Sequence, residues 1–279
     1  MKVTSFGTTT LLFDDGRDQV LFDAHLTRPS LPRYIFGRGT TDAALADGLL
    51  AAHHADRLRA IFISHSHHDH VMDMPHIATR CGANVYGSPS ALNVARGGGV
   101  PEECLTAFEG GETFSVGNYR VTVLPSRHSK PTLLNIDLGQ TIDAPLFQPA
   151  RLRSYKEGGS FDFLVAAGNR KYLIRPSFNY IEGQLDGLRA DVLFLGVAGL
   201  ARADGETERK FFAETVDKVR PKLVVPLHWD NFFSRLDRPA RGMPRLVEKT
   251  ELALFRLVRQ CEARGIDCVV QLPRTSMEV

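Results

Sequence analysis

Apolar and polar positions alternate along this chain in a way that predicts strands and helices throughout. Residues 1–25 predict a β-meander, built from short apolar or β-branched runs at 3–6, 10–13 and 20–24. Thr41-Asp42 is typical of a helix cap, and the Ala- and Leu-rich stretch after it predicts a helix to about His53. The continuous apolar run 60–64 predicts a strand that is buried on both faces.

The same alternation of predicted strands and helices continues to the end of the chain. We expect further helices after the 60–64 strand to Arg80, from Ser88-Pro89, and at 206–219 and 246–264. We expect further strands at 84–86, 120–124, 133–138, 161–166, 171–175, 191–197, 222–227 and 268–272. Alternating strands and helices indicate layers of helix packed on sheet, an α/β fold. Without an obvious linker or short repeat, residues 1–279 are predicted to form a single domain.

One stretch, 141–159, has no clear period. It carries Pro145, Pro149, Arg151, Arg153 and Lys156 among polar and apolar residues. Such a segment is either a surface loop or a lid inserted beside a functional site, and the sequence leaves both open.

Composition and charge narrow the possible partners and location. An apolar fraction of 43% and a charged fraction of 24% are ordinary for a globular protein, and a formal net charge of +2 disfavours nucleic acid as partner. The four cysteines form no C-x-x-C pair, which favours free thiols in a reducing compartment. The start has no apolar leader and no apolar window is long enough to span a membrane, so we expect a cytoplasmic protein without a membrane partner. The oligomeric state cannot be predicted.

The strongest chemical signal is the run His65-Ser66-His67-His68-Asp69-His70, directly after the buried strand. In an extended chain His65 and His67 point to the same side, so both imidazoles can reach one cation. Asp69 and His70 begin a predicted helix, project differently and can serve a second cation. Zinc favours this mixture of nitrogen and carboxylate ligands, so the run predicts a zinc site, with manganese or iron as alternatives.

At this point the sequence resembles the metallo-β-lactamase fold superfamily, whose signature is H-x-H-x-D-H after an apolar strand. Its start resembles the ascorbate-phosphate-lactonase-like branch, with Leu21-Phe22-Asp23 at the family's apolar-Asp motif. The segments 125–128 (PSRH) and 225–230 (VPLHWD) match the family's later histidine positions, so the resemblance covers nearly the whole chain. It implies an αβ/βα four-layer sandwich of two central sheets flanked by helices, with the metals at the sheet edges.

The resemblance also implies roles for individual residues. One zinc is expected on His65, His67 and His128, and a second on Asp69, His70 and His228. Asp69 and His228 are the expected catalytic residues, and Asp23 is expected to orient a ligand imidazole from behind. His25, two residues after Asp23, is a weaker candidate for facing the site.

Ser177 departs from the family pattern. The family usually supplies an aspartate that bridges both metals, and here the corresponding segment is Pro176-Ser177-Phe178-Asn179-Tyr180. Three hypotheses follow: a two-zinc site with only a bridging water, a one-metal enzyme, or a degenerate site. Alternatively, Asn179 or Asp162 fills the gap.

The function implied is a zinc-dependent hydrolase that uses a metal-bound hydroxide on a small-molecule substrate, a lactone, ester or phosphodiester. Arg127, Lys130 and Arg175 lie next to candidate site positions, so the substrate is expected to be anionic, with Lys130 or Arg175 as its anchor. A regulatory, non-catalytic metal-binding protein and a nuclease of the same superfamily are the alternatives.

Overall fold

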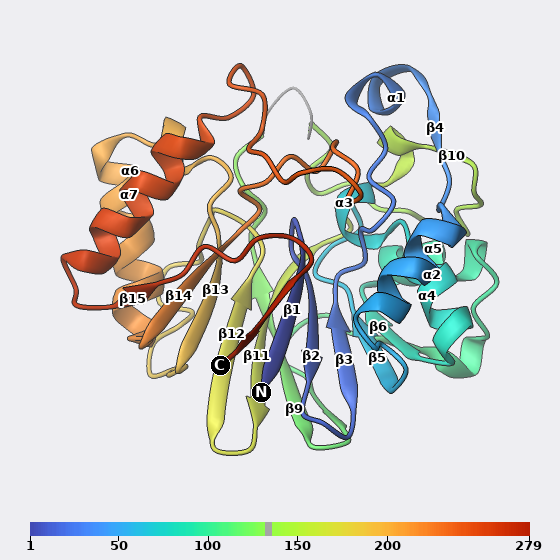
Figure 1. Cartoon of the computed structure of the whole chain (residues 1–279), viewed down its shortest axis with the longest axis horizontal. Helices are drawn as coiled ribbons and strands as arrows, with labels where there is room; N and C mark the ends of the chain where they lie inside the picture. Colours follow the sequence, from blue (N-terminus) through green and yellow to red (C-terminus); the bar gives the residue numbers. More distant parts are fainter. Residues whose placement is uncertain (132–135) are drawn as a thin grey trace.

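Two seven-stranded β-sheets lie face to face in the computed structural model, which describes residues 1–131 and 136–279 (Figure 1). The first sheet has the order β16 (Thr275–Glu278), β1 (Lys2–Gly7), β2 (Thr10–Asp14), β3 (Gln19–Phe22), β5 (Leu58–Phe62), β6 (Asn84–Gly87) and β7 (Leu105–Ala107). The second has the order β15 (Asp267–Cys268), β14 (Leu223–Leu227), β13 (Val192–Gly196), β12 (Arg170–Arg175), β11 (Ser160–Ala167), β9 (Tyr119–Ser126) and β8 (Thr113–Val116).

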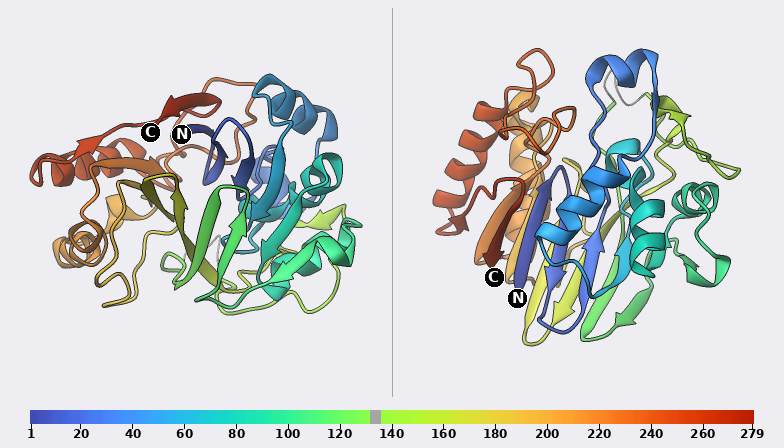
Figure 2. Two further views of the ribbon diagram at one scale, coloured as in Figure 1. Left: turned by 90° about the horizontal axis from the view of Figure 1, so that it is seen from below. Right: turned by 45° about the vertical axis from the view of Figure 1, so that its right-hand side comes forward.

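Helices cover the outer face of each sheet, and the two views of Figure 2 show the resulting four layers. The first sheet is covered by α2 (Ala43–Ala52), α4 (Met74–Cys81) and α5 (Pro89–Gly97). The second is covered by α7 (Thr250–Glu262) and by α6 (Gly205–Phe212), which continues as a π-helical turn (Ala213–Asp217). The predicted αβ/βα sandwich is confirmed.

The two-residue period of the strands explains this layering. In β2, β3 and β5, the side chains of Phe13, Phe22 and Phe62 pack between the sheets, whereas their neighbours Leu12, Leu21 and Ile61 pack under the helices. Successive strand residues point to opposite faces, so apolar residues on both faces require a cover on both sides.

Short elements lie around the upper edge of the sheets in Figure 1. These are α1 (Leu31–Phe36), α3 (His68–Val71), the small sheet of β4 (Arg38–Gly39) with β10 (Ala150–Arg151), and the 3-10 turns Leu152–Ser154 and Leu200–Arg202. The 3-10 turn Glu102–Cys104 directly precedes β7 and lies at the opposite edge, because β7 is parallel to β5 and β6. At the upper edge β5, β9, β12 and β14 end, and each is followed within three residues by a predicted site residue: His65, His128, Ser177 or His228.

Several predicted elements differ from the structure. The helix expected after the histidines is split into α3 and α4, because Asp73 accepts hydrogen bonds from the backbone of Leu26 and Thr27 and Pro75 lies in the first turn of a new helix. The strand expected at 268–272 is wrong beyond Cys268; the final strand is β16, which pairs with β1 in the other sheet. Half of the strand expected at 133–138 lies outside the described residues, and the described half, 136–138, is not a strand.

The described residues bear on the predictions about the cysteines and about membrane-spanning segments. All four cysteines are free thiols, as the sequence predicts. No helix within residues 1–131 and 136–279 has the length and apolar character needed to cross a membrane.

Candidate metal centre

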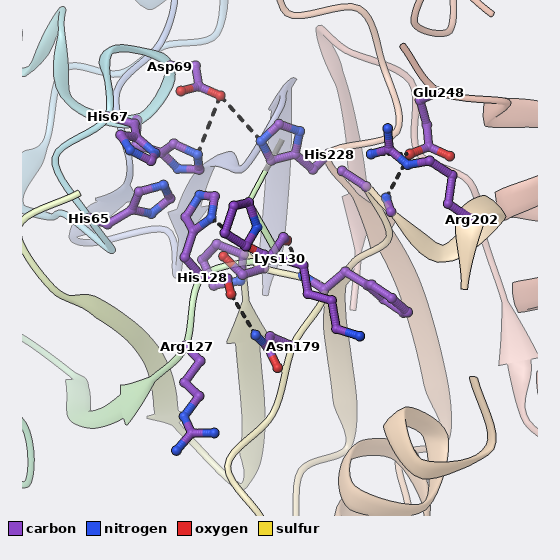
Figure 3. A pocket seen from close by; sticks show the side chains of 18 of the residues that line it. His65, His67, Asp69, Arg127, His128, Lys130, Asn179, Arg202, His228 and Glu248 are labelled. Carbon is purple, nitrogen blue, oxygen red and sulfur yellow. Dashed lines mark hydrogen bonds and ion pairs between the residues drawn. The ribbon is translucent and has the colours of Figure 1, made fainter. Parts of the chain in front are cut away.

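The six predicted metal ligands come together as two groups of three. One group is His65, His67 and His128, and the other is Asp69, His70 and His228; within each group the donor atoms lie within 4.8 Å of one another. The groups are adjacent, since the ring centroids of His65 and His70 are 3.7 Å apart. Figure 3 shows the labelled histidines converging with Asp69 on one region of the pocket. These two groups are the same two ligand sets that the family resemblance implies.

The end of β5 positions the first four donors. Asp23 follows β3, and its carboxylate accepts hydrogen bonds from the Ser64 backbone N–H (2.7 Å) and hydroxyl (2.8 Å), which fixes the chain just before His65. Asp23 itself has a positive φ of 53°, as does His228 with 58°. Such conformations cost of order 1 kcal/mol for residues other than glycine and often mark functional sites.

In three of the histidines, the ring nitrogen that faces away from the groups has a partner. Asp23 Oδ2 lies 2.7 Å from His70 Nδ1, Ser64 Oγ lies 3.1 Å from His65 Nδ1, and the Ser129 carbonyl accepts from His128 Nδ1 at 3.0 Å. Partners of this kind fix the tautomer and orient the other nitrogen toward a cation.

The inner nitrogen of His65 provides a test of whether a cation fits. His65 Nε2 is buried, and no described residue gives it a hydrogen-bond partner. An unpartnered buried nitrogen is costly unless it has a ligand. A first group of three imidazoles and a second group of two imidazoles and a carboxylate both match transition-metal donor sets. The residues therefore fit a metal.

Electrostatics favours the protonation states that metal ligands need. Burial, reinforced by His70, holds the pKa of His65 well below its usual range, and burial together with His67 lowers the pKa of His128 to about 3. Burial alone would raise the pKa of the Asp69 carboxyl, but His70 and a hydrogen bond with His228 outweigh it, so the pKa lies well below its usual range. At neutral pH the two imidazoles are thus neutral and Asp69 is ionised.

His228 is held by residues that sequence reasoning did not identify. Its backbone N–H donates to the Thr8 carbonyl at 2.7 Å, and the Thr8 N–H donates to Asp230. Asp230 forms a buried ion pair with Arg28 at 2.7 Å. These contacts tie the end of β14, in the second sheet, to the turn between β1 and β2 in the first. The only sequence signal was the position of Asp230, two residues after a predicted ligand.

The donors lie in a cavity of about 960 Å³ with two unlike walls. One wall is aromatic: Tyr34, His68 and Phe233 are buried, the Tyr34 and His68 rings are 5.0 Å apart, and Phe232 meets His228 at 5.1 Å. The other parts carry cations. Two of these cations have acidic partners: Lys210 pairs with Glu206, and Arg202 pairs with Glu248. Four other lining cations have no acidic partner among the ion pairs of the described residues: Arg127, Lys130, Arg153 and Lys156.

The predicted anchors differ in their positions. Lys130 lines the cavity, and so does Arg127, although Figure 3 shows its guanidinium directed away from the histidines. Arg175 is not among the lining residues; it is 1% exposed and forms an ion pair with buried Asp162 at 3.1 Å. The prediction that Arg175 contacts substrate is therefore corrected: its charge is paired with Asp162 of the neighbouring strand.

The residues considered for the metal-bridging position lie in different places. Ser177 is buried and lines the cavity. Asp162 does not fill the gap, because it lies on β11 against Arg175; burial raises its pKa to about 6. Asn179 lines the cavity, but its side-chain amide donates to the His128 carbonyl at 2.7 Å. His25 does not line the cavity; its Nε2 lies 3.1 Å from the Phe232 carbonyl.

Comparisons with known proteins agree with this geometry. The sequence profile of the β-lactamase superfamily domain matches residues 18–229, more than half of the chain. A UPF0173 metal-dependent hydrolase of Methylobacterium nodulans is 28% identical over 83% of this chain and 86% of its own length. A protein of the same name from Chloroflexus aurantiacus is 33% identical, but over only 32% of this chain and 35% of its own length.

Among solved structures, a metallo hydrolase of the archaeon Ignicoccus hospitalis, Igni18, shares the fold. It superposes with a TM-score of 0.59 at 15% identity, covering 100% of this chain and 98% of that chain.

Proposed function

Because this chain belongs to the β-lactamase superfamily and is a metal-dependent hydrolase, we propose that it uses zinc to hydrolyse an ester, lactone or phosphodiester bond in a small anionic metabolite. The observation that carries this proposal is the pair of three-donor groups, with donor atoms within 4.8 Å of one another in each, in a cavity that also carries cations without an acidic partner among the described residues. The free cysteines support the cytoplasm as its location.

Zinc is proposed from the chemistry of the donors. Three imidazoles are a common zinc set with a position left for water. The second group, Asp69, His70 and His228, is a two-histidine, one-carboxylate set that also suits iron. Metal analysis of the purified protein therefore decides the identity.

The chain's own residues have these roles in the proposed reaction. Zinc, when bound, lowers the pKa of water and polarises the bond under attack. Asp69 is ionised and has its Oδ2 3.3 Å from His228 Nε2, so its carboxylate is proposed to accept a hydrogen bond from the attacking water and orient it. His228 lines the same cavity and is proposed to stabilise the developing oxyanion. The aromatic wall excludes water from one side of the reaction.

The first prediction concerns the metal and the activity together. Replacing both His65 and His67 by alanine should abolish bound metal and reduce hydrolysis of generic ester and phosphodiester probes to background, because two of three donors in one group are removed. Elemental analysis by mass spectrometry and initial-rate assays measure this. His76→Ala is the matched control, since His76 lies on α4 and pairs with Asp47. A wild-type protein that binds no metal, or a double variant that keeps it, contradicts the proposal.

The second prediction concerns the charge of the substrate. Lys130→Ala should raise KM about tenfold for an ester that carries a free carboxylate, because one charge-assisted hydrogen bond contributes about 1.5–3 kcal/mol. The same ester with its carboxylate methylated should be hydrolysed equally by both proteins. Lys171→Ala is the control, because Lys171 is exposed on β12 and does not line the cavity. Equal KM values for the two esters, in both proteins, would refute an anionic substrate.

A further inference from the structure

Asp137 contacts a predicted metal ligand, although it lies outside every motif of the sequence. Its Oδ2 is 3.2 Å from Nε2 of His67, and the two side chains are only 13% and 10% exposed. A carboxylate that accepts the Nε2–H of a neutral imidazole leaves the Nδ1 lone pair for a cation. Among the described ligands, His67 thus receives the same kind of support that Asp23 gives to His70.

Asp137 belongs to a stretch, the 136–159 segment, that is attached to the metal-binding turn. Ser66, between the two histidines, donates its backbone N–H to the Glu157 carbonyl (2.8 Å) and its hydroxyl to the Lys156 carbonyl (2.7 Å). Gly158 has a φ of 66°, and a Cβ there would lie 2.4 Å from Ser66 Oγ. The positive φ and the lack of room for a Cβ beside the Ser66 side chain therefore require glycine at this position.

Glu157 holds the two ends of the 136–159 segment together. Its carboxylate accepts from the backbone N–H of Gly139 (2.6 Å) and from the Ser160 hydroxyl (2.7 Å), and Gly158 N–H donates to the Gln140 carbonyl at 2.9 Å. These bonds hold the start of the segment, with Asp137, beside its end at the metal-binding turn. The segment also supplies Leu152, Arg153, Tyr155 and Lys156 to the cavity wall.

We propose that Asp137 is a positioning residue: it fixes the tautomer and orientation of His67, and thereby links metal binding to the conformation of the 136–159 segment that forms part of the substrate cavity. The inference rests on the proposed metal-dependent function. It concerns a residue and a segment that the ligand motif does not include. In this arrangement one hydrogen bond, between His67 Nε2 and Asp137, connects the segment that lines the cavity with the imidazole whose Nδ1 would hold the cation.

The test is zinc titration of metal-free protein, by competition with a chromophoric chelator, for wild type, Asp137→Ala and Asp137→Asn. Loss of a carboxylate behind a ligand histidine weakens metal affinity about 10- to 100-fold, so we expect this for alanine. Asparagine keeps an oxygen that can accept the Nε2–H and should recover part of the affinity. Asp143→Ala is the matched control, because Asp143 is an exposed acid of the same segment.

Amide hydrogen exchange separates positioning from a merely structural role. In wild type, zinc should slow exchange at Gly139 and Gly158, whose N–H groups are bonded inside the segment. In Asp137→Ala, the zinc-saturated protein should show at most a fraction of that slowing. Unchanged affinity in the alanine variant, or equal zinc-induced slowing in variant and wild type, overturns the inference while leaving the proposed function intact. A wild type that binds no zinc overturns both.

Discussion

At the scale of single residues, Ser177 is the position with the clearest chemical consequence. It is buried in the wall of the cavity that holds both donor groups, at the place where the family resemblance leads one to expect a bridging carboxylate. A neutral hydroxyl supplies no negative charge between two dications, so the second cation should be held less tightly than a carboxylate would hold it.

A carboxylate at this position should restore that charge. We expect Ser177→Asp to increase the affinity or the occupancy of the second metal, measured by calorimetric zinc titration of metal-free protein. Ser177→Ala serves as control and should behave like wild type, because it changes the side chain without adding charge. Identical stoichiometry and affinity in the aspartate variant would mean that residue 177 is not the bridging position.

At the scale of elements, α3 combines ligands with an aromatic wall. His68 is the residue between two predicted ligands, and its ring packs on Tyr34 and Phe233 at 5.0 and 6.3 Å rather than facing the donors. Burial, with a further contribution from His67, lowers the pKa of His68 to about 4. The ring is therefore neutral in the folded protein at pH values where it is protonated in the unfolded chain.

This difference predicts a pH dependence of stability for metal-free protein. Above the unfolded pKa of about 6.5 neither state of His68 is protonated, and the group has no effect. As the pH falls from 6.5 to about 4, the unfolded chain takes up a proton that the folded protein does not, so stability decreases by up to about 3 kcal/mol.

His68→Phe should reduce this loss, because phenylalanine keeps the ring packing without a titratable nitrogen. Urea unfolding of chelator-treated wild type and variant at pH 7.5 and pH 4.5 measures the effect. Equal loss of stability in the two proteins would show that His68 does not contribute.

At the scale of the whole molecule, the metal centre joins the two sheets. His65, His67, Asp69 and His70 follow β5 of the first sheet, whereas His128 and His228 follow β9 and β14 of the second. The buried pair of Arg28 and Asp230 connects the same two parts without a metal. Each donor group is therefore complete only when the sheets are correctly packed, and a cation that binds the folded state adds to its stability.

Much of this protein was readable from the sequence, because the relevant signals are local. The apolar run 60–64 followed by four histidines in six residues predicted both a buried strand and its metal-binding end. The runs 10–13 and 20–24 predicted the meander strands that the structure shows as β2 and β3. The family resemblance then supplied His128 and His228, which no local pattern could assign.

Only the tertiary structure decided which charged residues serve the site. Arg175 ends a strand beside Ser177, yet it pairs with Asp162 of the neighbouring strand on the face that carries Leu173 and packs under the helices, because alternation along β12 directs it there. Asp137 lies 70 positions from His67 in the chain and has no motif, yet its carboxylate reaches the imidazole. Such contacts join segments that are distant in the chain, so the spacing and periodicity of residues along the sequence do not predict them.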